Sequence, residues 1–421
     1  MHSSIDGENH KCAQTQHIEM PFEDFNDHLS FHRHDRKIRN PFIVYLDFET
    51  RLDETHQTDK IKQIHIPYSY MLMFIYEGQK EPVKYMRQSH DHNQLMIQFW
   101  NDMDDIRARS LVIVDNPATM IFDNKAEMEF NNSECCHFCG LGFTKKFKSG
   151  KMKGKIVPKV RDHCHVTGKF RGAAHSTCNL QSKLSFKTQI PVVCHNLSGY
   201  DSHIIIKSFN FNGRECIDIL DENGKMVRKK KSITCIPLNG EKFMSFTVGH
   251  TFKFIDSARF YPESLSALVE AQSNGFTNYD SFKYTNEFIR TFVTPDRPFK
   301  ELQKLLIGKG VYPYKKTGQD LSCLPPIEDF FNDLVDQPCS KKDYQRAQEV
   351  YKSFGCQCFR DYHDLYLGWE VLGVRWSWVC DEFSNDVSLQ AHFSSNKFPS
   401  MKLIIFWKCR PSWDLGWQTE R

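Results

Sequence analysis

The feature that most constrains the fold of this chain is a group of metal-ligand residues between positions 136 and 178. Cys136 and Cys139 form a C-x2-C pair, and His175 and Cys178 form an H-x2-C pair. Two such pairs, separated by a few dozen residues, suit a tetrahedral zinc ion with nitrogen and sulfur ligands. The sequence therefore predicts that these four residues bind one structural zinc.

Two alternatives to this ligand set stay open. Cys135 could replace Cys136, although it breaks the x2 spacing, and the thiols could instead be buried free cysteines, as Cys often is. The chain has fifteen cysteines, an odd number, and its first twenty residues are polar and lack the apolar core of a signal peptide. Reduced thiols with one metal site therefore fit better than a disulfide framework.

The same segment carries polar side chains that a structural zinc site does not need. In "RDHCHVTGKFRGAAHSTCN" (161–179), His163 can act as a general base, because the ordinary pKa of a histidine lies near neutrality. Asp162 and Asn179 offer oxygen ligands of the kind that Mg²⁺ binds. Hydrolysis of a phosphodiester needs such a base and such a metal. The pattern indicates either a DNA-binding zinc unit or a hydrolytic site built on one.

Basic residues surround this cluster. Between Thr144 and Arg171 there are eight Lys and two Arg against one acid, whereas the whole chain has a net charge of only +3. Any preference for nucleic acid must therefore be local. Such a run is usually a solvated face, but its position beside the His/Cys cluster favours phosphate contact. The predicted DNA-binding lysines are Lys145, Lys146, Lys148, Lys151, Lys153 and Lys155.

A pair of carboxylates lies on a predicted strand. "NPFIVYLDFET" (40–50) is an apolar, β-branched run that indicates a buried strand. Asp47 and Glu49 are two residues apart and would point to the same face, where their charges repel unless a cation lies between them. Taken alone, the pair would more simply be solvated acids at a strand end.

Two later segments supply further candidate residues. "IPVVCHNLSGYDSHIIIKSF" (190–209) predicts a strand, a turn and a helix whose first turn projects Asp201. "DYHDLYLGWEV" (361–371) predicts a helix on which Tyr366 and Glu370, at i and i+4, share one face. The capping-box-like "SKKD" (340–343) predicts the start of another helix, and two Asn-Gly turns at 223–224 and 239–240 predict β hairpins.

Together these residues resemble the site of a DEDD-type 3′–5′ exonuclease. Such a site holds two metal ions about 4 Å apart for in-line hydrolysis of a phosphodiester. The resemblance implies Mg²⁺ or Mn²⁺ at Asp47, Glu49, Asp201 and Glu370, with Tyr366 orienting the attacking water. It also implies an α/β (α+β) fold, a ribonuclease-H-like exonuclease domain.

The resemblance extends to a particular family. "YLDFET", "HNLSGYD", "FIDSARFYPESLSALV", "KGVYPY", "LPPIEDFF" and "DYHDLY" are similar to ordered segments of protein-primed family-B DNA polymerases. The best match is to those of Polinton/Maverick-type virus-like transposons, over roughly residues 18–372. The second motif carries Asn196 and Tyr200, for which the resemblance implies contact with DNA. The implied partner is DNA, as a single-stranded 3′ end and as duplex or branched DNA.

The zinc segment resembles the endonuclease VII type of the His-Me finger (HNH) nucleases, a small ββα-metal unit. Asp162, His163 and Asn179 stand at the catalytic places of that group. Polinton-type polymerases carry such an insert before their second exonuclease motif. Two departures matter: the second zinc pair is His-x2-Cys rather than two cysteines, and Cys164 stands where the phage enzyme has a second Asp. Zinc accepts His readily, but the lost carboxylate argues against cleavage.

The resemblance also implies domain boundaries. We expect a polar lead-in over 1–40, an exonuclease domain over 41–132 and 191–372, a zinc insert over 133–190 and a divergent tail over 373–421. Glu370 replaces the usual Asp of the third motif, and the Leu-rich continuation of the family is lost after it. No polymerase palm motif follows. We expect a frameshifted or mis-spliced tail, or a divergent helix, and no polymerase activity.

Two classes of function stay open. One is a truncated family-B polymerase fragment that keeps an active 3′–5′ exonuclease with an endonuclease insert. The other is an inactive, zinc-dependent DNA-binding remnant of a transposon. The presence of Asp47, Glu49 and Asp201 favours the first class, whereas Glu370 and the tail favour the second. No apolar run approaches the roughly 20 residues of a membrane helix, so we expect an intracellular, nuclear protein with no membrane segment.

Overall fold

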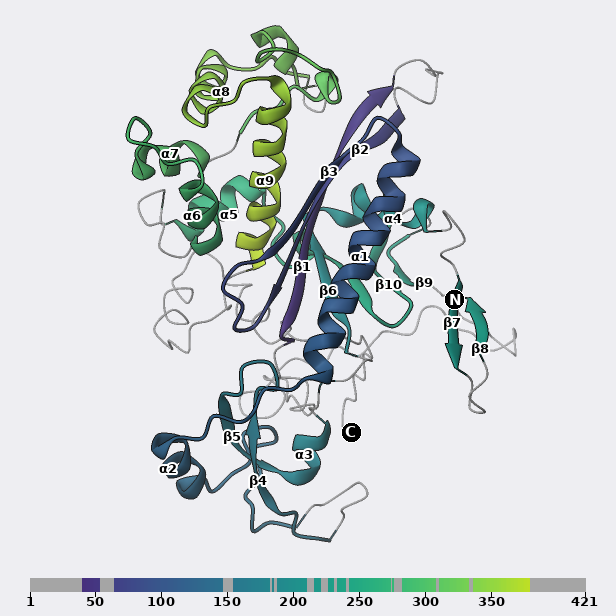
Figure 1. Cartoon of the computed structure of the whole chain (residues 1–421), viewed down its shortest axis with the longest axis vertical. Helices are drawn as coiled ribbons and strands as arrows, with labels where there is room; N and C mark the ends of the chain where they lie inside the picture. Colours follow the sequence, from purple (N-terminus) through teal and green to yellow (C-terminus); the bar gives the residue numbers. More distant parts are fainter. Residues whose placement is uncertain are drawn as a thin grey trace, which may run out of the picture.

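The computed structural model describes the chain between residues 40 and 378, apart from several internal segments. The described residues are 40–53, 64–146, 154–181, 184, 188–209, 216–220, 226–230, 233–239, 242–273, 275, 282–307, 310–332 and 336–378. They form a mixed α/β structure around one large sheet, with a smaller unit beyond one end of it (Figure 1). The predicted lead-in and nearly all of the predicted tail lie outside the described residues.

The large sheet has seven strands in the order β3-β2-β1-β6-β11-β10-β9. β1 pairs antiparallel with β2 and parallel with β6, and β6 pairs parallel with β11. The outer pairs, β3 with β2 and β10 with both β11 and β9, are antiparallel. The strands are β1 (Phe42–Asp53), β2 (Ile64–Tyr76), β3 (Val83–Gln88), β6 (Ile190–Cys194), β9 (Ile233–Pro237), β10 (Phe243–Val248) and β11 (Phe252–Asp256).

Helices cover both faces of this sheet (Figure 1). They are α1 (His92–Asp115) and α4 (Asp201–Ser208) on one face, and α5 (Leu265–Gln272), α6 (Lys283–Arg290) and α9 (Phe359–Trp378) on the other. On β1, Val44 and Leu46 pack in the core under α1, whereas Tyr45 packs in the core under α9. Successive side chains of a strand point to opposite faces. Asp47 and Glu49 therefore lie on the α9 side of the sheet.

Shorter elements complete the layer beside α9. α7 (Phe299–Leu306) and α8 (Lys341–Ser353) follow α6, with 3-10 turns at Tyr314–Lys316 and Ile327–Phe330. Asp343 N donates a hydrogen bond to Ser340 Oγ (3.1 Å), so α8 begins at the predicted cap. β7 (Cys216–Leu220) and β8 (Met226–Lys230) form a hairpin around the first Asn-Gly turn, which itself lies outside the described residues.

A small unit interrupts the chain between α1 and β6. It contains α2 (Asn124–Asn132), the antiparallel hairpin of β4 (Lys159–His163) and β5 (Phe170–His175), and α3 (Ser176–Gln181). α1 ends and β6 begins toward the same end of the sheet, so the insertion leaves the large core continuous (Figure 1). α2 packs against β5, although the predicted boundary at 133 assigns it to the exonuclease domain. The small unit therefore begins before residue 133.

The main predicted elements form. β1 covers the strand predicted at 40–50, β6 and α4 flank the predicted turn, and α9 covers the predicted helix and continues to Trp378, past the expected boundary at 372. In the part of the chain that the structure describes, no helix combines the length and the apolar character that crossing a membrane requires.

Candidate metal centres

The first candidate site begins on β1. Glu49 pairs with Ser69 of β2, and the register of the two strands shifts directly after Glu49. Glu49 is buried and Asp47 is partly buried. Burial, followed by the charges of Asp201 and Glu370, holds the pKa of Asp47 well above its ordinary value. Burial and the same two charges also raise the pKa of Glu49, so the four acids lie within electrostatic reach of one another.

Asp201 arrives from the end of a parallel strand. β6 ends at Cys194, a 3-10 turn (Leu197–Gly199) follows, and Asp201 opens α4. The Oδ1 atom of Asp201 is buried and has no hydrogen-bond partner. Burial, with the charge of Asp256, raises the pKa of Asp201 to about 8. A buried carboxylate oxygen without a donor is a group that a bound cation would satisfy.

Glu370 and Tyr366 approach from α9. Tyr366 is buried, and its hydroxyl oxygen lies 3.0 Å from that of Tyr314. Burial, with the charge of Glu370, holds the pKa of Tyr366 well above its ordinary value, so the hydroxyl keeps its proton. The structure thus brings together the four predicted acids and the predicted tyrosine.

The donor set of this acid cluster consists of carboxylate oxygens. Burial and mutual repulsion both favour protonation of the acids, and a divalent cation would reverse this preference. Hard oxygen donors suit Mg²⁺ and Mn²⁺ rather than softer metals. Asp47, Glu49, Asp201 and Glu370 could therefore hold the metal ions that the sequence predicts.

Sequence reasoning missed two residues beside the acid cluster. Asp256 ends β11, and its Oδ2 atom accepts a hydrogen bond from Ser198 N (3.0 Å) in the turn that precedes Asp201. The carboxyl ends of parallel strands meet at one edge of a sheet, and that rule could have found Asp256. Tyr314, which contacts Tyr366, begins a 3-10 turn and ends the segment "KGVYPY", whose resemblance to the polymerases could have drawn attention to it.

The two residues predicted to contact DNA lie in the turn before α4. Asn196 is exposed and has a left-handed backbone (φ 61°), which reverses the chain after β6. The hydroxyl of Tyr200 hydrogen-bonds with Thr50 Oγ, and it lies 2.7 Å from His65 Nδ1. Tyr200 is therefore fastened to β1 and β2 immediately beyond Glu49.

The second candidate site is a complete set of soft metal ligands. The donor atoms of Cys136, Cys139, His175 and Cys178 all lie within 4.8 Å of one another. Cys139 Sγ is 3.4 Å from His175 Nδ1. Burial, followed by the neighbouring thiols, raises the pKa of Cys178 to about 12, so several thiolates would not persist here without a cation. This Cys3His cluster could bind a metal such as zinc.

Local structure explains how these four ligands meet. The first pair lies on a tight knuckle, in which Gly140 N donates to Cys136 O (2.8 Å) and Gly140 has a positive φ of 70° that favours glycine. His175 ends β5, and Cys178 lies in the first turn of α3, so the hairpin and the helix present both to the knuckle. Cys135 is exposed and outside the ligand group, which agrees with the x2 spacing through Cys136.

Asp162 already has partners in this structure. Arg171 Nε donates to Asp162 Oδ2 (2.7 Å) and Arg171 Nη2 donates to Oδ1 (2.8 Å), while His137 Nε2 lies 3.1 Å from Oδ2. Burial alone would raise the pKa of Asp162, but His137 and Arg171 together hold it below its ordinary value. Asp162 is therefore not an open oxygen ligand, and Mg²⁺ binding there would have to displace Arg171.

The other two predicted residues of the insert are partly exposed. His163 ends β4 directly after a register shift, and its ring centroid is 4.9 Å from that of His165. Asn179 lies in α3, directly after Cys178. Both side chains are partly buried. The roles of His163 as a base and of Asn179 as a Mg²⁺ ligand stay predictions.

The basic residues of the insert fall into two groups. Lys145, Lys146 and Lys155 are exposed and available for phosphate contact. Lys148, Lys151 and Lys153 lie outside the described residues. Arg161 instead packs on α2 and the segment before it, with its Cζ atom 4.6 Å from the Phe122 ring and 4.7 Å from the Phe130 ring.

The turn between β4 and β5 docks the small unit on the large sheet. Cys164 Sγ donates to Glu77 Oε2 (3.0 Å), and Ala118 N donates to His165 O (2.7 Å). Glu77 N donates to Pro41 O, which places this contact where β1 begins. An Asp in place of Cys164 would put a second negative charge against Glu77, which accounts physically for the departure noted in the sequence.

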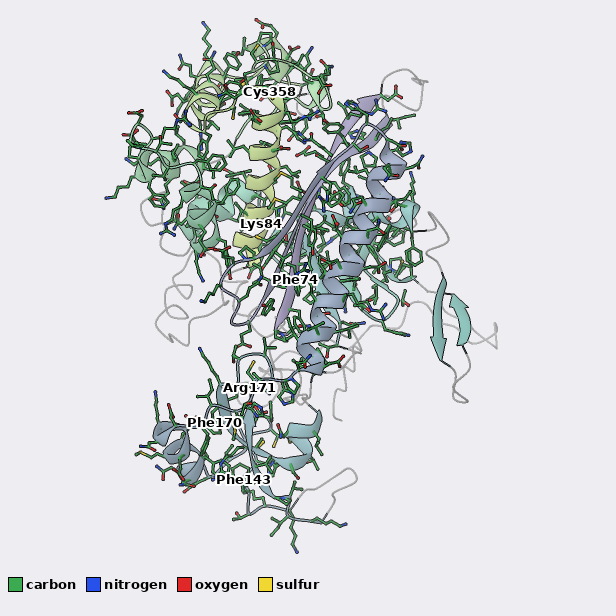
Figure 2. The ribbon with its side chains drawn as sticks, viewed as in Figure 1. Phe74, Lys84, Phe143, Phe170, Arg171 and Cys358 are labelled. Atoms are coloured by element: carbon green, nitrogen blue, oxygen red, sulfur yellow. The ribbon has the colours of Figure 1, made fainter. Side chains whose placement is uncertain are left out.

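The two candidate sites lie toward opposite ends of the sheet. The small unit adjoins the start of β1, whereas the acids follow toward the carboxyl ends of β1 and β6. In Figure 2, Phe170 and Arg171 mark the small unit, beyond the end of the sheet where β1 begins.

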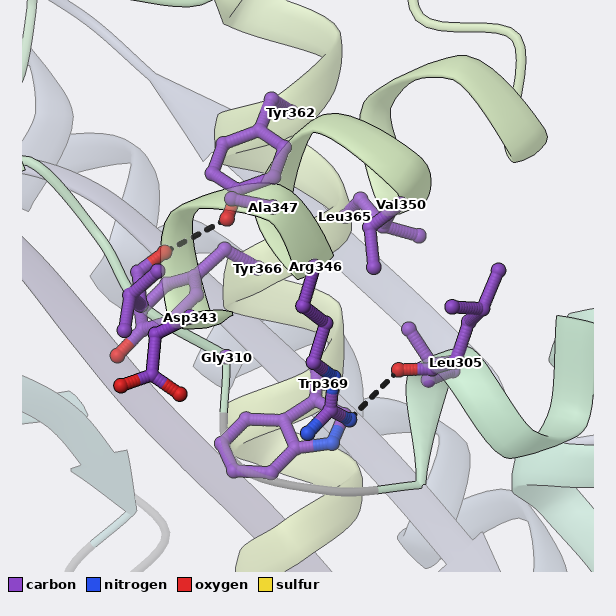
Figure 3. A pocket seen from close by; sticks show the side chains of 12 residues that line it. Leu305, Gly310, Asp343, Arg346, Ala347, Val350, Tyr362, Leu365, Tyr366 and Trp369 are labelled. Atoms are coloured by element: carbon purple, nitrogen blue, oxygen red, sulfur yellow. Dashed lines mark hydrogen bonds between the residues drawn. The ribbon is translucent and has the colours of Figure 1, made fainter. Parts of the chain in front are cut away.

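A small, partly open cavity of about 30 Å³ lies behind Tyr366 (Figure 3). Leu365, Tyr366 and Trp369 of α9 line it together with residues of α7 and α8. Arg346 is the cation in this lining, and its Nη2 atom donates to Leu305 O (2.7 Å). The four acids of the first site do not line it, so the cavity is separate from the acid cluster.

No protein-family model, no curated protein and no solved structure matches this chain. A functional assignment therefore depends on the geometry of its own residues.

Proposed function

We propose that this chain is the exonuclease region of a family-B DNA polymerase of the protein-primed, Polinton-like type. It would remove nucleotides from a single-stranded 3′ end by two-metal hydrolysis. The observation that carries the proposal is the convergence of Asp47, Glu49, Asp201 and Glu370 from three segments of the chain, β1, α4 and α9. Among the described residues, no Lys or Arg contributes to the raised pKa of Asp47 or Glu49, so a structural ion pair does not explain the burial of these two acids.

The sheet supports a ribonuclease-H-like reading of the fold. An antiparallel β1-β2-β3 meander continues through β1 into the parallel strands β6 and β11, with helices on both faces. Ligands of such sheets bind beyond the carboxyl ends of the parallel strands. The acids of β1 and α4 lie toward that edge, which agrees with a catalytic site there.

The side chains around the acid cluster suggest how the reaction would proceed. Metal ions held there would lower the pKa of a bound water and stabilise charge on the scissile phosphate. Tyr366, kept protonated by burial and fixed by Tyr314, would orient the attacking water. Tyr200, held by Thr50 and His65, would hold the terminal nucleotide beside Glu49.

For the insert, we propose a zinc-bound His-Me-finger-like unit that binds DNA. The order β4, β5, α3 and the Cys3His cluster support this assignment. The engagement of Asp162 by Arg171 favours binding over cleavage. The same observation, together with Glu370, favours the second candidate function for the whole chain, a DNA-binding remnant without turnover.

A degradation assay tests the proposed function. The purified chain is incubated with 5′-labelled single-stranded DNA in Mg²⁺ or Mn²⁺ and compared with Asp47→Asn. We expect stepwise shortening from the 3′ end, and a loss of roughly a thousandfold in Asp47→Asn, because metal-ion stabilisation is worth several kcal/mol. Asp105→Asn, which removes an acid from α1 on the other face, is the matched control and should degrade DNA like the unmodified chain. DNA binding without shortening in either metal would support the remnant instead.

A further inference from the structure

A buried histidine lies on the same side of α9 as the proposed catalytic residues. His363 is 2% exposed and precedes Tyr366 by about one helical turn. Its Nε2 atom lies 2.7 Å from Ser69 Oγ, and its Nδ1 atom lies 2.6 Å from the Tyr312 hydroxyl. Burial, with the charge of Arg360, lowers the pKa of His363 to about 4. The neutral ring donates through one nitrogen and accepts through the other, so both nitrogens are used.

Each partner of His363 leads to the acid cluster. Ser69, 294 residues away in the sequence, is the β2 residue that pairs with Glu49. Tyr312 stacks on Tyr366 with ring centroids 4.6 Å apart. His363 therefore links Ser69, which lies opposite Glu49, to Tyr312, which packs on Tyr366. Tyr366 in turn precedes Glu370 by one helical turn.

The attachment of α9 to the sheet does not itself require a histidine. Leu365, Leu367, Val371 and Leu372 already bury apolar surface in the core under α9. Apolar contacts tolerate small shifts along a helix axis, whereas a fully satisfied buried polar network selects one geometry. Burial of a polar ring also has a desolvation cost that an apolar side chain would avoid. The two hydrogen bonds of His363 are therefore better explained by a role in orienting α9 on the sheet.

We propose that His363 is a positioning residue that fixes the height and rotation of α9, so that Tyr366 and Glu370 reach the metal site. This inference rests on the proposed exonuclease function. His363 contacts neither substrate nor metal; it acts through Ser69 and Tyr312.

Three variants of the full chain test the inference. His363→Phe fills the space and removes both hydrogen bonds, and His363→Gln restores one donor or acceptor. Tyr362→Phe is the matched control, since it removes a partly buried hydrogen bond to Val311 O (2.6 Å) from the neighbouring residue of α9. The readouts are kcat and KM on single-stranded DNA, Mn²⁺ affinity by electron paramagnetic resonance, and Tm.

We expect His363→Phe to lower kcat about 10- to 100-fold, because a displacement of about 1 Å can cost a hundredfold. Mn²⁺ affinity should fall severalfold, while KM stays within about twofold. His363→Gln should recover part of kcat. Tyr362→Phe should lower Tm and leave kcat within about twofold. If His363→Phe does not fold, Ser69→Ala removes the same contact from β2 and should lower kcat in the same direction.

The outcomes separate this inference from the proposed function. Unchanged kcat and unchanged Mn²⁺ affinity in a folded His363→Phe, beside an active unmodified chain, would overturn the positioning role alone. Equal losses of kcat in His363→Phe and Tyr362→Phe would also overturn it, because general loosening of α9 would then suffice. An unmodified chain that neither binds Mn²⁺ nor shortens DNA would overturn both. Mn²⁺ binding without turnover would overturn the exonuclease, and the change in Mn²⁺ affinity would still decide the role of His363.

Discussion

The two candidate metal sites of this chain are built in opposite ways. The Cys3His cluster takes all four ligands from a knuckle, a hairpin and a short helix within residues 136–178. The acid cluster takes its residues from β1, the start of α4 and the middle of α9, between residues 47 and 370. A local site can form as soon as its own segment folds, whereas a distributed site exists only when the whole sheet and α9 are in place.

The two sites also differ in what a metal would do for them. Soft sulfur and nitrogen ligands that close around one ion are typical of structural zinc, whose binding free energy is folding free energy. A cluster of buried carboxyl groups that repel one another can exist without a metal ion only if some of the groups stay protonated. Loss of metal should therefore unfold the first site and should instead protonate the second.

The largest expected effect is on the zinc unit. Cys139→Ser should abolish zinc binding and unfold the unit, because structural zinc contributes about 10–16 kcal/mol in small domains. Metal analysis should find one zinc in the unmodified chain and none in the variant, and hydrogen exchange should show lost protection over β4, β5 and α3. Cys235→Ser, in β9, is the control and should retain zinc. Absence of stoichiometric zinc in the unmodified chain would end the assignment.

The next effect concerns the chemistry of the insert. If the unit cleaves DNA, His163→Ala should reduce nicking of duplex DNA about 100- to 10,000-fold, the usual range for a general base, and leave DNA affinity nearly intact. His165→Ala, which alters the neighbouring ring, is the matched control. Nicking that survives in His163→Ala would rule out this base. If the unit only binds, affinity should fall steeply with salt because Lys145, Lys146 and Lys155 release counterions.

A smaller change is expected at Glu370. Aspartate there would keep the charge and move the carboxylate back by one methylene, and it is the residue usual at this place in the proposed family. Glu370→Asp should raise the rate of 3′–5′ degradation by up to about a hundredfold, the scale associated with a 1 Å displacement. Glu370→Gln, which keeps the length and removes the charge, should lower the rate. A rate that is unchanged or lower in Glu370→Asp would show that Glu370 is not the fourth ligand.

The last effect is the dependence of stability on pH. The pKa of Asp201 is raised to about 8, above its ordinary value of about 4, so the folded chain binds more protons than the unfolded chain between these values. In EDTA, the free energy of unfolding should therefore fall as pH rises through this window.

Mn²⁺ at about ten times its Kd should add about 1.4 kcal/mol to the free energy of unfolding near pH 8. Denaturant titrations measure both quantities, and Asp201→Asn should flatten the pH slope and remove the Mn²⁺ effect. The prediction would be contradicted if the free energy of unfolding rose with pH in the unmodified chain but not in Asp201→Asn. Asp201 would then be ionised, not protonated, in the folded chain.

The sequence by itself determined the local parts of both sites. The x2 spacings specified the four soft ligands, and the structure brings their donor atoms together. Alternation along residues 40–50 placed Asp47 and Glu49 on one face, and the i, i+4 spacing placed Tyr366 and Glu370 on one side of a helix. Such patterns can be recognised in a sequence because the direction of the side chains repeats every two residues in a strand and about every 3.6 residues in a helix.

Only the tertiary structure decided which distant groups meet. It paired Arg171 with Asp162, placed Asp256 beside the turn before Asp201, and joined His363 to Ser69 across 294 residues. It also assigned α2 to the small unit that holds the Cys3His cluster rather than to the large sheet. These contacts depend on strand order, on the register of β1 with β2 and on the packing of α9, none of which a local repeat encodes. The sequence therefore determined the ligands that are neighbours along the chain, while folding of the whole sheet decided how the separated carboxylates are held.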